Sequence, residues 1–319
     1  MDEPSRIERT LDTGPTARLE LSNLSGSITV RPWERHEVRV TATIDADGSR
    51  DLIDVSIEGS GNVVTAKARP ARIDGNWVRR LVASNNIPSV HFEISCPGAS
   101  DVIAKSAAGD IDIANLEGGV DIDQAAGRTR IADHVGNVDI KGVSGEFSGT
   151  KLDGSVRYKS VTGNLEVLDS RVTGLSIQTV TGKIVVDPLP VADEPISIHT
   201  VSDQTKLTLD PASHCRVTLR TVTGTINTDL PFEVLENSRT KWEAQLNGGG
   251  REIGLKSVSG NFDLVSAVPV DETSGASAPR PRQGSPANVL KSLEGGDIDV
   301  DEALKLLESG SHPSNPNPK

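Results

Sequence analysis

Apolar and polar residues alternate between Ser106 and Leu168 with a period of nine, and seven such blocks follow one another without insertion. Position 4 of every block is glycine. Positions 6 and 8 are mostly aliphatic, as in Ile111 and Ile113, with charged residues beside them. Residues two apart share a face of a β-strand, so the pattern predicts short strands with aliphatic side chains inward and charges outward. The glycine predicts a turn, and the fixed period indicates a repeat architecture.

Two arrangements of these blocks remain open. Two blocks could form one parallel coil of eighteen residues, or each block could pair antiparallel with the next. The 18-residue register joins the unlike charges Asp112 and Arg130, but it also joins the like charges Asp121 and Asp139. The nine-residue register joins Asp121 with Arg130, but also Asp112 with Asp121. Position 2, small or apolar in most blocks, is expected to point inward at the corner.

The later part of the chain favours the coil. The corner motifs TVTG at 179–182, TVSD at 200–203 and TVTG at 221–224 recur every 21 residues, with a strand-like run between them. Two strands per repeat fit this spacing. We therefore predict an all-β fold, a parallel β-solenoid or β-helix, and expect right-handed coils because connections between parallel strands are right-handed with few exceptions.

Turn signals and composition divide the rest of the chain. Residues 16–100 are predicted to form an antiparallel β cap, and SVSGNFDL at 257–264 is expected to be the last repeat. The predicted order is a flexible lead at 1–15, the N-terminal cap at 16–100, the solenoid at 101–268, a disordered linker at 269–285, a helical hairpin at 286–309 and a disordered tail at 310–319.

Two segments outside the repeats are candidates for partner contact. A basic and apolar cluster interrupts the cap at 71–89, where the alternative is a loop folded back on the cap. In the hairpin, leucines lie on one face of each helix, and Asp299 with Glu302 resembles a capping box. The candidate residues are Trp77, Arg79, Arg80, Leu290, Leu293, Leu304 and Leu307.

Composition narrows the classes of partner that the chain could bind. Among 319 residues, only 3% are aromatic, which suits a thin solenoid filled by aliphatic stacks. The net charge of −12 argues against nucleic acid and makes anionic membranes poor partners. The chain shows no secretory signal and no transmembrane run, so we expect a cytoplasmic protein, with peripheral envelope association as the alternative. Cys96 and Cys215 are expected to be buried free thiols rather than a disulfide.

The sequence offers no strong site for chemistry. The aspartates flank core isoleucines within strands, as on a solvated face and unlike a calcium roll. The six histidines do not cluster as zinc ligands do, and neither a serine elbow nor a readable Cys–His pair is present. Paired carboxylates of polysaccharide-cleaving β-helices would arise by chance on so acidic a surface. We predict no catalytic residue, no metal and no cofactor.

Two resemblances rest on these motifs. Residues 16–268, with GSITVRPWERHEVRVTATI and VHFEISCPGASDVIAKSAAGDIDIANLEGGVDI, resemble the bacterial "putative adhesin" β-strand-repeat family, a domain of unknown function. Residues 286–309 are similar to SHOCT-like helical hairpins, which implies oligomerisation or partner contact. The resemblance implies a non-enzymatic scaffold or interaction protein linked to cell-envelope stress, which contacts a protein partner or self-associates. The alternatives are a regulatory module acting through its hairpin and, third, a polysaccharide-binding or polysaccharide-cleaving β-helix.

Overall fold

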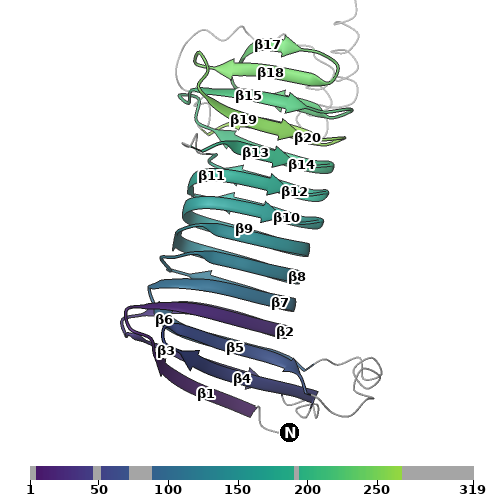
Figure 1. Cartoon of the computed structure of the whole chain (residues 1–319). Coiled ribbons are helices and arrows are strands. Elements are labelled where there is room, and N and C mark those ends of the chain that lie inside the picture. Colours follow the sequence, from purple (N-terminus) through teal and green to yellow (C-terminus); the bar gives the residue numbers. More distant parts are fainter. Residues whose placement is uncertain (1–4, 46–51, 72–87, 190–193, 268–319) are drawn as a thin grey trace, which may run out of the picture. The chain divides into compact units, whose positions relative to one another are not determined.

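Twenty β-strands, hydrogen-bonded into one sheet, make up the part of the chain that the computed structural model describes, residues 5–45, 52–71, 88–189 and 194–267 (Figure 1). These residues contain no α-helix, so the all-β prediction is confirmed for them. The strands are β1 (Ser5–Asp12), β2 (Thr16–Trp33), β3 (Glu37–Ile44), β4 (Ile53–Ser60), β5 (Val63–Pro70), β6 (Val90–Pro97), β7 (Ala99–Ala114), β8 (Val120–Val135), β9 (Val138–Lys159), β10 (Thr162–Leu168), β11 (Arg171–Gln178), β12 (Thr181–Asp187), β13 (Ile196–His199), β14 (Ser202–Leu209), β15 (Cys215–Arg220), β16 (Thr225–Thr228), β17 (Glu233–Asn237), β18 (Lys241–Leu246), β19 (Arg251–Lys256) and β20 (Asn261–Ser266).

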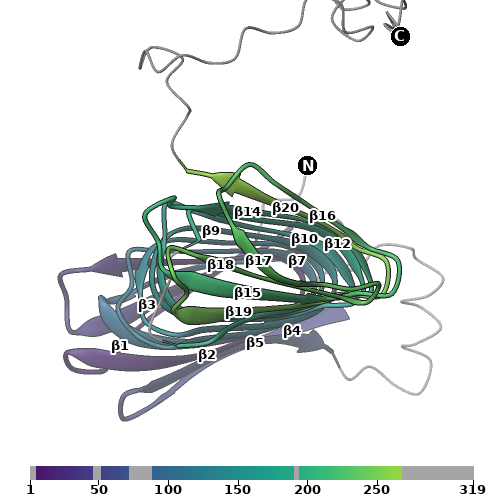
Figure 2. The same ribbon diagram turned by 90° about the horizontal axis from the view of Figure 1, so that it is seen from above.

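The nonapeptides form parallel coils of eighteen residues. Val102 lies beside Val120, and Val120 beside Val138, so β7, β8 and β9 stack with two blocks per coil. Each coil bends at a corner and contributes one strand segment to each of two sides, which face each other across the core (Figure 2). The parallel coil is therefore confirmed over the antiparallel alternative, while the right-handed sense of the coil stays a prediction.

Aliphatic stacks fill the space between the two sides. Ile111, Ile122 and Ile140 are at most 3% exposed, as the alternation predicted. The glycine at position 4 has a steric cause: a Cβ on Gly127 would clash with the carbonyl oxygen of Gly109, one coil earlier. Since the same contact recurs from coil to coil, a side chain at this position would push two coils apart.

The N-terminal region differs from the sequence prediction. β2 is not antiparallel: it pairs in parallel with β5, β6 and β7, so Thr16–Trp33 is already a full coil of the stack. Antiparallel pairing does occur beyond it, where β1 joins β3, β3 joins β6 and β4 joins β5. The alternating pattern of β2 fits either pairing, because alternation reports which face is buried and not the direction of the neighbour.

The last repeat in sequence is not the last in space. β19 lies between β13 and β15 (Figure 1), and β20 pairs with β14 on one side and β16 on the other, all in parallel. The chain builds the coil of β15 and β16 first, covers its end with the antiparallel pair β17–β18, and then returns to fill the gap. Trp242 and Phe232 pack edge to face with ring centroids 5.7 Å apart, partly buried against the core at this end.

Position 2 of the nonapeptide behaves differently at the two corners of each coil. At one corner Leu116, His134 and Leu152 are at most 2% exposed, as predicted. At the other corner Val143 and Val161 are 56% and 48% exposed, so the expectation of an inward side chain is wrong there. The outer corner is therefore lined by apolar side chains that the core does not use.

Candidate interaction surface

None of the seven sequence-based candidates for partner contact can be placed. Trp77, Arg79, Arg80, Leu290, Leu293, Leu304 and Leu307 all lie outside the described residues, so they stay predictions. The surface described below comes instead from the solenoid, in which the sequence had indicated no site.

Groups that could carry chemistry are sparse in the described ranges. These residues hold no cluster of three or more His, Cys, Asp or Glu side chains that could bind a metal ion. Cys96 and Cys215 are buried free thiols, as predicted, and burial raises the pKa of each to about 11. Within the same residues no helix is long and apolar enough to cross a membrane.

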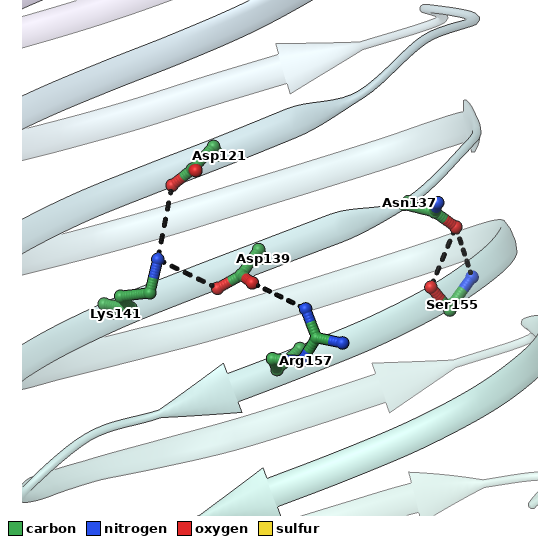
Figure 3. A network of polar contacts seen from close by, with 6 residues as sticks. All are labelled: Asp121, Asn137, Asp139, Lys141, Ser155 and Arg157. Atoms are coloured by element: carbon green, nitrogen blue, oxygen red, sulfur yellow. Dashed lines mark hydrogen bonds and ion pairs between the residues drawn. The ribbon is translucent and has the colours of Figure 1, made fainter.

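Most charges on the flat outer face have a partner in a neighbouring coil. Asp121 and Asp139 are neighbours in the 18-residue register, and Lys141 Nζ lies 3.8 Å from Asp121 Oδ1 and 3.5 Å from Asp139 Oδ1 (Figure 3). Arg157 Nη1 lies 2.9 Å from Asp139 Oδ2. The carboxylates, Asp139 before Asp121, raise the pKa of Lys141. The like-charge contact in this register is thus offset by basic residues, and this face is paired and solvated.

The outer corner carries a straight row of exposed valines. We call Val143, Val161, Val180, Val201, Val258 and Val222, in the order in which they stack, the valine column. Backbone hydrogen bonds join their coils, from Val180 N–H to the Val161 oxygen at 3.2 Å and from Thr223 N–H to the Val258 oxygen at 3.0 Å. Their exposed fractions run from 41% to 60%. Six coils spaced by about 4.8 Å give a row roughly 24 Å long.

A second row runs beside the valine column. The residue two before each valine lies on the outer side of the same strand end, with a buried Ser or Thr between them in most coils. We call these residues the basic column: Lys141, Lys159, Gln178, His199, Lys256 and Arg220. Register pairs follow the row, joining Gln178 with His199, His199 with Lys256, and Lys256 with Arg220. The two columns together are the valine–basic strip.

Carboxylates offset two of the four cations of the strip: Asp121 and Asp139 lie beside Lys141, and the charge of Arg220 acts on Glu243. Lys159 and Lys256 make no ion pair with any described residue, in contrast to Lys141. Burial and then the charge of Lys256 lower the pKa of His199. On the other flank each valine is followed by Ser or Thr, and the one carboxylate in these corner motifs, Asp203, is only 3% exposed. The strip is therefore locally positive around Lys159 and Lys256, on a chain of net charge −12.

Toward the N-terminal end Asp123 interrupts the basic row: it lies between Lys105 and Lys141 in register, with its Oδ2 3.5 Å from Lys105 Nζ. Lys105 lies beside Ser22, and Ser22 beside Lys67, next to a surface hollow of about 470 Å³ that is also lined by Arg69. The valine column gives way there to smaller residues, since Ala107 and Ala125 occupy its place. The apolar part of the strip is thus confined to the second half of the stack.

Stacked parallel coils with an aliphatic core define a β-solenoid-like repeat protein. The profile of the Toastrack DUF4097 family matches residues 12–265, most of the chain. The chain therefore belongs to the Toastrack DUF4097 family, a family of unknown function. No curated protein matches it.

Several solved structures resemble the chain at low similarity. A "putative cell adhesion protein" from Clostridium sporogenes is 8% identical with a TM-score of 0.27, covering 83% of this chain and 100% of its own. A "putative adhesin" from Bacteroides fragilis is 12% identical with a TM-score of 0.32, covering 82% and 97%. A "Putative lipid binding protein" from Parabacteroides distasonis is 11% identical with a TM-score of 0.24, covering 82% and 96%. Because these TM-scores lie below 0.5, none of the three assigns a function to this chain.

Proposed function

We propose that this protein is a non-enzymatic scaffold that binds another macromolecule through the valine–basic strip. The observation that carries the proposal is the valine column, six half-exposed side chains in register on a rigid sheet. Contiguous apolar surface of this kind marks interaction sites in soluble proteins, whereas single exposed valines need no explanation. The ladder of backbone hydrogen bonds holds the row straight, so little conformational entropy is lost on binding.

Photo-cross-linking in the cells that produce the protein tests this function without assuming a partner. Benzoylphenylalanine replaces Val180 in the strip or, as a matched control, Lys206, which is exposed on the other side of the stack. We expect adducts from position 180 and none from position 206. Equal labelling at both positions, or no adduct at either, would contradict the proposal.

The predicted C-terminal hairpin at 286–309 lies outside the described residues, and its role as a regulatory module stays a prediction. A cytoplasmic location, its alternative of peripheral envelope association, and a link to envelope stress likewise stay predictions. The polysaccharide alternative has no described groove with a buried carboxylate pair to support it, so we carry it no further.

A further inference from the structure

The valine–basic strip combines two features that a single partner must satisfy. In each of the six coils an exposed valine lies two residues after a basic residue or, once, a glutamine. The valine column therefore runs beside cations toward both of its ends and beside Gln178 and His199, whose pKa is lowered, in its middle. An apolar partner alone leaves the cations unused, and a soluble polyanion alone leaves the valines in water.

The paired outer face shows that the positive charge of the strip is a local property. Lys141, at one end of the basic column, is held by Asp121 and Asp139. Further along, Lys159 and Lys256 have no ion pair with any described residue, so their charge faces solvent. Burial is the larger cause of the lowered pKa of His199, and the charge of Lys256 beside it adds to the shift.

An anionic bilayer offers both complements at once. Its headgroup phosphates attract Lys and Arg, and the boundary just below them accepts small apolar side chains. A second copy of this chain fits less well, because its own strip is positive as well. We propose that the valine–basic strip docks this protein on an anionic lipid surface, with the valine column at the headgroup boundary and the basic column on the phosphates.

This inference rests on the proposed function and names the partner of the same strip. It departs from the expectation that net charge set for membranes. That expectation averaged over the whole chain, whereas a docking surface responds to charges within about one Debye length, roughly 8 Å at physiological ionic strength.

The test is co-flotation of the full-length protein with vesicles. One set contains phosphatidylcholine alone, and in the other phosphatidylglycerol replaces part of it. We expect binding only to the second set, weakening as salt increases. Failure to bind these vesicles would overturn the inference.

Charge variants distinguish binding through the strip from an effect of the net charge of the protein. The strip variant carries Lys159→Gln, Arg220→Gln and Lys256→Gln, and the matched control carries Arg130→Gln, Lys183→Gln and Lys206→Gln, all exposed on the other side. A cation near such a surface contributes roughly fivefold in affinity, so the strip variant should bind on the order of 100-fold more weakly. The control should lose less than about fivefold, since its cations lie away from the surface. Equal losses in both variants would contradict docking through the strip.

A probe at the valine column tests insertion directly. A polarity-sensitive fluorophore on Val180→Cys should shift to the blue with phosphatidylglycerol vesicles, and one on Lys206→Cys should not. The native thiols are buried with a pKa near 11, so labelling favours the introduced cysteine. Thermal unfolding followed by circular dichroism confirms that each variant is folded.

The outcomes distinguish the two proposals. If position 180 cross-links to a protein and vesicles do not bind, the scaffold function stands and the lipid inference fails. If inorganic polyphosphate binds the strip while vesicles do not, the partner is a soluble polyanion and the lipid inference also fails. If position 180 gives no adduct of any kind, both proposals fail.

Discussion

The two corners of each coil occupy the same position in the nonapeptide and have opposite environments. Leu152, at the corner where position 2 is buried (the inner corner), is 2% exposed. Val161, nine residues later at the outer corner, is 48% exposed. Both are apolar residues at position 2, so residue type does not separate them. The difference shows that the same position of the nonapeptide closes the core at one corner and leaves an apolar side chain in contact with solvent at the other.

At each corner one coil carries a buried ionisable residue where its neighbouring coils have leucine or glycine. At the inner corner His134 takes the place that leucine has in the coils on either side, and it is fully buried. At the outer corner Asp203 takes the place of the corner glycine, between Gly182 and the coil that carries Gly260. The following four experiments test this comparison, beginning with the largest expected effect.

Shortening the apolar side chain should distinguish the corners most clearly. Leu152→Ala opens a cavity in the core and should lower the free energy of unfolding by about 2–5 kcal/mol. Val161→Ala removes an exposed side chain and should change it by no more than about 0.5 kcal/mol. Urea unfolding followed by circular dichroism measures both, and comparable losses would show that the outer valines pack as core residues.

Removing the buried carboxylate at Asp203 should stabilise the protein at neutral pH. Burial raises the pKa of Asp203 to about 6 from 3.8, and the Gly182 N–H offsets only part of this shift. Because the folded state then binds the proton more tightly, stability falls as pH rises from about 4 to about 6. Asp203→Asn should therefore gain on the order of 2–3 kcal/mol at pH 7.5 and little at pH 4. A gain independent of pH would point to a cause other than ionisation.

His134 should give the stability of the protein the opposite dependence on pH. Burial lowers the pKa of His134 below its usual 6.5, so the unfolded chain takes up the proton first as pH falls. Its contribution to stability is present above pH 6.5 and is lost as the pH falls below it. We expect His134→Leu to flatten this part of the profile, measured as urea midpoints between pH 7.5 and 5.5. An unchanged slope in the variant would mean that His134 is already charged in the fold.

The smallest change in stability should come from replacing lysines of the basic column. Lys141→Gln leaves Asp121 beside Asp139 with only Arg157 to offset them, so a slight loss of thermal stability should appear at low salt and vanish at high salt. Lys159→Gln breaks no ion pair and should leave the melting temperature unchanged while weakening vesicle binding. If both substitutions change stability alike, the contrast between paired and unpaired cations is wrong.

The local sequence pattern was sufficient to predict the strands and the core. Alternation identified Ile111, Ile122 and Ile140 as buried, and the nine-residue period placed the corner glycines, because both depend on contacts that each repeat makes in the same way. Charge could not decide the register, since each register joins one unlike and one like pair. In the structure Lys141 contacts both aspartates of the like-charge pair and offsets their repulsion. Lys141 is a diagonal neighbour, so matching residues one to one along the register does not include it.

Three features depended on which coils become neighbours. β2 joins the parallel stack, and β19 and β20 enter between coils that precede them in the chain. The corner motifs SVSG and TVTG are nearly the same, so sequence similarity alone does not order them in space. The insertion places Val258 between Val201 and Val222 and Lys256 between His199 and Arg220, and thereby makes both columns continuous.

The amino-acid sequence by itself determined that this chain forms repeated short strands around an aliphatic core, because burial of every second residue and the corner glycine recur in each repeat. The parallel pairing was favoured by the sequence and established by the structure. Only the tertiary structure decided which corner faces water and which cations stand together. Those depend on coil lengths of 18, 19 and 21 residues and on the insertion of the final coil, which bring distant residues into one row.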